Sequence, residues 1–154
     1  MYNINMNKYI EKLEDYVSGI RELQGQSLPI GVIILDGSKE QKQEVFEYLR
    51  NKEMEIVELN MHPDLILWKI FNSLSSGKSI ALDVNGDIPI KILDELKNMH
   101  LFKRMDIMIS GETERKILNP IPQGTFVIFI LDEENYKKAM LGEISSSFCN
   151  LKYI

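Results

Sequence analysis

Pro29-Ile-Gly-Val-Ile-Ile-Leu-Asp36 is the stretch of sequence that decides the fold. It is a continuous apolar run, rich in β-branched residues and too short for a buried helix. Such a run is typical of a strand that is covered on both faces, as in a parallel sheet. Two further apolar runs also stop at an aspartate, Ile80-Ala-Leu-Asp83 and Phe129-Ile-Leu-Asp132. We therefore predict three buried strands that each end at a carboxylate.

The segments around these strands alternate between helical and extended patterns. Apolar residues at helical spacing predict helices over residues 6–24, 39–52, 63–77, 89–99 and 133–141, with an irregular tail after them. Residues 55–59 predict another strand, and residues 105–109 and 115–121 predict a β-hairpin around a short loop. Because strands alternate with helices, we predict an α/β fold in which a three-layer, mainly parallel sheet is flanked by helices and carries a β-hairpin insertion.

Length and composition limit the function classes. The 154 residues fit one domain (1–154), with an N-terminal helix at about 6–24 and a core at about 29–141. A net charge of −5 argues against direct binding of nucleic acid, which needs clustered lysines and arginines. One cysteine and two distant histidines argue against a metal site built from these residues. The sequence has no membrane-length apolar run and no signal-peptide pattern, so we expect a cytoplasmic protein.

The strand-ending aspartates form a candidate site. Ligands of open α/β sheets bind outside the carboxyl ends of the strands, where Asp36, Asp83 and Asp132 would converge, with Asp87 close by in sequence. Such an acidic strand-end cluster repels phosphate unless a divalent cation or lysines intervene. The alternative is structural, since an aspartate often caps the turn or helix that follows a strand.

The segment Leu82-Asp-Val-Asn-Gly-Asp-Ile-Pro89 and the order of elements resemble the AAA+ domain of sigma-54-dependent transcription activators, whose Walker B region reads GGTLFLDEIGDLP. Residues 32–45, VIILDGSKEQKQEV, align without gaps with the Walker A segment of that family, VLILGESGTGKELV. The resemblance covers most of the chain from about Tyr9. It implies a P-loop NTPase/AAA+-like α/β subdomain and places Ser38, Lys42 and Asp83 at vestigial nucleotide-binding positions.

The chain departs from this family at the parts that perform nucleotide chemistry. Asp36, Lys39 and Gln41 replace the Walker A glycines. A residue with a Cβ costs about 1–2 kcal/mol wherever the loop needs left-handed backbone, so we expect no phosphate-cradling loop. Val84 stands at the position of the catalytic glutamate and cannot activate a water molecule.

Other parts that the resemblance would bring are also missing. Ser145 and Leu151 stand near the positions of the family's trans-acting arginines. The stretch between Asn60 and Gly77 has no GAFTGA loop, and no counterpart of the helical lid follows the core. The resemblance therefore implies a pseudo-ATPase with a degenerate P-loop, and we expect no enzyme activity, no cofactor and no metal site.

Three functions follow from these observations. The first is a catalytically inactive AAA+-like domain that acts in transcription regulation as a regulatory or protein-interaction module, binding a protein partner or a second copy of itself. The second is a magnesium-dependent phosphoacceptor or hydrolase, with Asp36 as the acceptor and Asp83 and Asp132 holding the cation. The third is residual ATP binding without hydrolysis, through Lys42 and Asp83.

Overall fold

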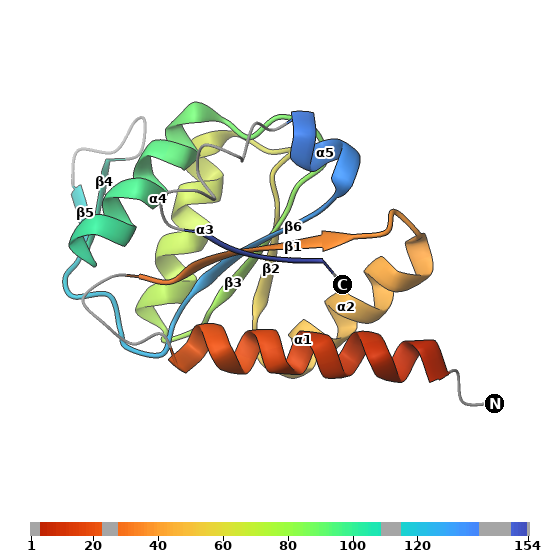
Figure 1. Ribbon diagram of the computed structural model, residues 1–154. Helices are drawn as coiled ribbons and strands as arrows, with labels where there is room; N and C mark the ends of the chain where they lie inside the picture. Colours follow the sequence, from red (N-terminus) through yellow and green to blue (C-terminus); the bar gives the residue numbers. More distant parts are fainter. Residues whose placement is uncertain (1–3, 23–27, 109–114, 139–148, 154) are drawn as a thin grey trace.

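The protein forms one parallel sheet with helices on both of its faces (Figure 1). The computed structural model describes residues 4–22, 28–108, 115–138 and 149–153, and the side chains of 10–22, 28–108 and 115–138. The sheet strands are β1 (Ile30–Leu35), β2 (Glu55–Glu58), β3 (Ile80–Asp83), β6 (Val127–Asp132) and β7 (Cys149–Tyr153). Their order is β2-β3-β6-β1-β7, and all neighbours are parallel. The prediction of an α/β fold with a parallel sheet is confirmed.

The helices form the two outer layers, as predicted. They are α1 (Ile4–Glu22), α2 (Lys39–Asn51), α3 (Pro63–Ser75), α4 (Ile90–Phe102) and the short α5 (Glu133–Lys138). Helices α1 and α2 cover one face of the sheet, and α3 and α4 cover the other (Figure 1). The predicted ends at residues 23–24 and 139–141 lie outside the described residues. Within the described part of the chain, no helix is both long enough and apolar enough to cross a membrane.

Strand β1 shows how the sheet separates two cores. Successive side chains of a strand point to opposite faces, and the six residues of β1 are all buried. Ile30, Val32 and Ile34 pack in the cluster that contains α3 and α4, whereas Ile33 and Leu35 pack in the cluster that contains α1 and α2. This burial on both faces explains why the sequence of the strand is continuously apolar.

Helix α1 approaches β1 closely at Gly31, where there is little room for a side chain. The Tyr16 hydroxyl oxygen accepts a hydrogen bond from the Val32 N–H at 3.0 Å, so the phenol lies over the strand. A Cβ at Gly31 would stand 2.1 Å from that oxygen and 2.6 Å from a methyl carbon of Ile20. A side chain at this position would displace the ends of Tyr16 and Ile20, so glycine leaves the room that the Tyr16 hydrogen bond needs.

The predicted hairpin is present as a separate two-stranded ribbon. Strands β4 (Met105–Met108) and β5 (Arg115–Leu118) pair antiparallel, and the predicted loop at 110–114 lies outside the described residues. The ribbon lies beside α4, at the opposite end of the molecule from α2 and α5 (Figure 1). Met105 and Ile107 are buried in the core, and the Lys116 ammonium lies 5.4 Å from the centre of the Trp68 ring on α3.

The prediction of an irregular tail is wrong for residues 149–153. These residues form β7, which pairs with β1 at the edge of the sheet. The sequence Cys-Asn-Leu-Lys-Tyr lacks the continuous apolar run of the buried strands. An edge strand has a neighbour on one side only and tolerates polar residues, so hydrophobicity alone does not reveal it.

Candidate functional site

The carboxyl ends of the central strands bring Lys42 and Asp83 into contact. The Lys42 Nζ lies 2.9 Å from Asp83 Oδ1, and the two side chains are 35% and 6% exposed. Asp83 ends β3, and Lys42 lies in the first turns of the helix that follows β1. The Asn85 side chain lies beside the pair, 3.4 Å from the Lys42 ammonium and 3.5 Å from Asp83 Oδ1. The two residues that resemble the Walker lysine and aspartate thus meet at one site.

Lys42 lies near the N-terminus of α2, and an N-cap residue sets where this helix begins. Ser38 has extended backbone angles, and its hydroxyl oxygen accepts a hydrogen bond from the Gln41 N–H at 3.2 Å. The Lys42 ammonium also lies 5.5 Å from the centre of the Phe46 ring, one turn further along the helix. Ser38 therefore serves as the N-cap that fixes where α2 begins.

The loop between β1 and α2 is closed by hydrogen bonds to its own side chains. The Gln41 side-chain oxygen accepts from the Asp36 N–H, and the Asp36 carboxylate accepts from the Ser38 N–H, both at 2.7 Å. Gln41 is almost fully buried. A P-loop directs consecutive backbone N–H groups at phosphate oxygens, whereas two N–H groups of this loop point at acceptors of the same chain.

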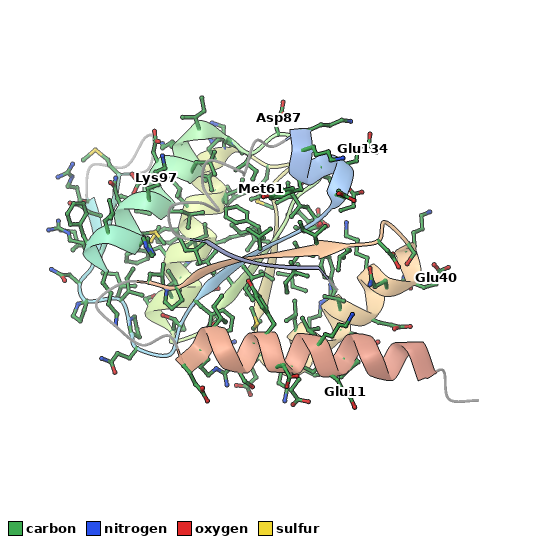
Figure 2. All side chains as sticks on the ribbon, viewed as in Figure 1. Glu11, Glu40, Met61, Asp87, Lys97 and Glu134 are labelled. Atoms are coloured by element: carbon green, nitrogen blue, oxygen red, sulfur yellow. The ribbon has the colours of Figure 1, made fainter. Side chains whose placement is uncertain are left out.

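The four acidic residues of the predicted strand-end cluster have separate surroundings. Asp132 caps α5 by accepting a hydrogen bond from the Asn135 N–H at 2.7 Å. Asp36 closes its own turn, and Asp83 pairs with Lys42. Asp87 is exposed at the outer surface near α5 (Figure 2). Among the described residues, no three His, Cys, Asp or Glu side chains are grouped so that they could hold a metal ion.

A small pocket lies at this edge of the sheet. Its volume is about 190 Å³, below the roughly 300–1,000 Å³ of typical small-molecule sites. The loop after β1, the start of α2 and the ends of β3 and β6 line it, including Ser38, Lys39 and Lys42. Val84 lies in its wall and is almost fully buried, so this part of the wall is apolar.

Three residues that contribute to this geometry were not among the predicted site residues. Gln41 holds the loop after β1, Asn85 flanks the ion pair, and the Asn135 side chain accepts a hydrogen bond from the Gly86 N–H at 3.1 Å. The signals in the sequence are weak. Asn85 precedes a glycine in a turn, and Asn135 stands three positions after a capping aspartate.

Comparison of the sequence with known proteins does not assign the chain to a family. No protein-family model matches the chain, and the search of curated proteins finds no significant match. The fold and the site define an α/β domain with a lysine–aspartate ion pair at the carboxyl edge of its parallel sheet.

Proposed function

We propose that this chain is a catalytically inactive AAA+-like domain of the sigma-54 activator type, which acts in transcription regulation as a regulatory or protein-interaction module. In this proposal the domain has the layered α/β architecture of that family. It binds partners through its outer surfaces and performs no nucleotide chemistry at its strand-end site. Its partner is a second copy of this chain or another protein.

The observation that carries this proposal is the ion pair between Lys42 and Asp83. In P-loop NTPases the Walker lysine contacts the β- and γ-phosphates, and the Walker B aspartate helps to hold magnesium. Both groups therefore belong to one site, and the contact supports the correspondence with Walker A and Walker B. Here each group neutralises the other, and a buried carboxylate such as Asp83 is costly to leave without its counter-ion.

Three further features support the loss of nucleotide chemistry. Gln41 and Asp36 accept hydrogen bonds from loop N–H groups that a P-loop would offer to phosphate. Val84 has no group that could orient or deprotonate an attacking water. The pocket of about 190 Å³ beside Lys42 lies below the usual volume of small-molecule sites.

Calorimetric titration with ATP in the presence of magnesium tests the first half of the proposal. We expect no saturable heat, and micromolar affinity would overturn the non-catalytic assignment. That outcome would favour residual ATP binding, for which the pocket beside Ser38 and Lys42 is the location. Lys42→Ala would then abolish binding, while the matched variant Lys97→Ala, at an exposed position of α4 that does not line the pocket, would retain it.

The regulatory half is tested with an active sigma-54 activator. Because AAA+ domains of this family work side by side, we expect the chain to change the ATP turnover of such an activator when it is added in excess. The same experiment with heat-unfolded chain controls for non-specific effects. Turnover that is unaltered at every ratio would count against a regulatory role on this class of activator.

A further inference from the structure

A second candidate surface lies away from the strand-end site, between α4 and the β4–β5 ribbon. Glu95, Asn98 and Phe102 stand three and four positions apart on α4 and thus share one helical face. This face and the ribbon line a groove of about 410 Å³, whose other lining residues are Arg104, Asp106 and Arg115. We call this groove and the outer face of the ribbon the α4–ribbon surface.

Exposed apolar side chains are concentrated on and beside this surface. Six large apolar residues of the described chain are strongly exposed, and four of them belong to the end of α4 and the ribbon: Leu101, Phe102, Met108 and Ile117. Phe102 is 65% exposed, although it stands on the helical face that lines the groove. Soluble proteins rarely leave such side chains grouped together unless they contact a partner.

The strand pairing explains why the outer face of the ribbon is amphipathic. Asp106 lies opposite Ile117, and Met108 lies opposite Arg115. Between these pairs, Ile107 is buried and the half-buried Lys116 lies near the Trp68 ring. The outer face therefore combines two apolar side chains with one acid and one base. Phenylalanine, methionine and arginine are enriched at protein interfaces, so this composition fits a protein partner better than a small ligand.

The charges of the α4–ribbon surface are of both signs and are incompletely satisfied. Arg104 donates a hydrogen bond to Asp106 Oδ2 at 3.1 Å, and Arg115 Nε forms a longer ion pair with Asp106 Oδ1 at 3.6 Å. Within the described residues, that oxygen is buried and accepts no hydrogen bond. Burial and the nearby Asp106 carboxylate raise the pKa of Glu95, so its negative charge is disfavoured in the isolated chain. A further cation would suit Glu95.

The α4–ribbon surface can satisfy these charges by meeting its own copy. A two-fold axis places the same patch on both sides of an interface, so that a residue on one copy meets a different residue on the other. Glu95 comes from α4 and Arg115 comes from the ribbon, on the two walls of the groove. In a symmetric pair, Glu95 of each copy can face Arg115 of its partner while Phe102 and Ile117 fill the centre.

We propose that a second copy of this chain docks on the α4–ribbon surface and forms a two-fold dimer, with Phe102 and Ile117 at its centre and Glu95 opposite Arg115 across the interface. This inference rests on the proposed function as an interaction module and names the partner. It leaves the strand-end site, which lies at the opposite end of the molecule, outside the interface (Figure 1).

Sedimentation velocity at increasing concentration of the full chain tests the dimer. We expect a reversible monomer–dimer equilibrium in the micromolar range. Phe102→Ser combined with Ile117→Ser should weaken the dimer about tenfold or more, as expected for central apolar residues. Ile90→Ser is the matched control, because Ile90 is 75% exposed but lies at the other end of α4. A chain that stays monomeric, or equal weakening by the control, would overturn the proposal.

A charge exchange tests the arrangement of the two copies. Glu95→Arg alone and Arg115→Glu alone each bring like charges together at both contacts, so each variant should be monomeric. An equimolar mixture of the two restores opposite charges at both contacts, and we expect it to form a heterodimer. Circular dichroism checks that each variant is folded. A folded pair that fails to associate would overturn the predicted contact, and this result would be independent of any ATP titration.

Discussion

Lys42 on α2 and Asp83 at the end of β3 form an ion pair with 2.9 Å between Nζ and Oδ1. Strand β6 lies between β3 and β1 in the sheet, and α2 follows β1, so the pair spans the carboxyl end of β6. Asp83 is nearly buried, and burial of an unpaired charge is strongly unfavourable. The contact therefore links helix α2, which follows β1, to the end of β3, across the strand that separates β1 from β3.

The first prediction concerns the contribution of Lys42 to stability as the counter-ion of the buried Asp83. We expect Lys42→Met to lower the free energy of unfolding by about 1–3 kcal/mol, because it leaves Asp83 with a weaker set of partners while water still reaches the pair. Urea denaturation measures the change. Lys39→Met is the control, since Lys39 is exposed and the substitution should alter stability by less than about 0.5 kcal/mol. Equal effects of the two variants would contradict a structural role for the pair.

The cap of α2 can be tested in the same way. Ser38→Ala removes the oxygen that accepts from the Gln41 N–H and should destabilise the fold by about 1 kcal/mol. Ser38→Asp keeps an acceptor and should recover most of this loss. The contrasting variant is Ser18→Ala on the exposed side of α1, where alanine should be neutral or slightly stabilising. A neutral Ser38→Ala would show that the start of α2 is fixed by other contacts.

Substitutions at two glycines test two effects separately: the close packing of α1 on β1, and the helix propensity of α1. Gly31→Ala places a methyl group against Tyr16 and Ile20 and should destabilise the protein by about 1–3 kcal/mol. Gly19→Ala meets nothing within 4 Å on α1 and should stabilise it by about 0.5–1 kcal/mol. Thermal unfolding of both variants gives the two signs directly. Stabilisation by both would mean that α1 can move away from β1 without cost.

Glu95 predicts a pH dependence of stability. Burial raises its pKa above the usual 4.5, Asp106 raises it further, and Lys91 offsets part of the increase. The folded state therefore holds the proton more tightly than the unfolded chain does, and the resulting stabilisation is lost as the pH rises through the raised pKa. Glu95→Gln avoids this loss, so in dilute protein its advantage over the natural chain should grow as the pH rises above the usual pKa of 4.5 and should level off above the raised pKa.

The control for this prediction is Glu11→Gln, at an exposed position of α1 that does not influence Glu95. Its effect on stability should vary less with pH than that of Glu95→Gln. Chemical denaturation at several pH values provides the comparison. An advantage of Glu95→Gln that is constant with pH would show that the ionised carboxylate is not disfavoured in the folded state.

The main elements of the fold could be predicted because their signals are local. The apolar run of β1 and the helical spacing that follows it are visible in a window of a few residues. Strand β7 could not be predicted, because its place depends on pairing with β1 across more than a hundred residues of chain. Long-range pairing leaves no periodic signal in the strand itself.

The candidate site was predictable only in part, for a similar reason. Asp83 was predicted as a strand-ending aspartate and again through the resemblance to a Walker motif, whereas Lys42 was identified through the resemblance alone. The bond between Asp36 and Gln41 and the bond between Gly86 and Asn135 depend on the final packing of loops. Side chains that satisfy nearby backbone groups are common in turns, so composition does not distinguish these two.

The position of β1 in the sheet has a consequence for synthesis of the chain. Strand β1 is made early, yet both of its neighbours, β6 and β7, come from the last part of the described sequence. The backbone N–H and C=O groups along both edges of this apolar strand therefore stay without strand partners until β6 and β7 have been synthesised. Folding that depends on such distant partners is slow, and unpaired apolar strands are prone to aggregate with other chains in the meantime. We expect nascent chains that stall before residue 127 to depend on chaperones.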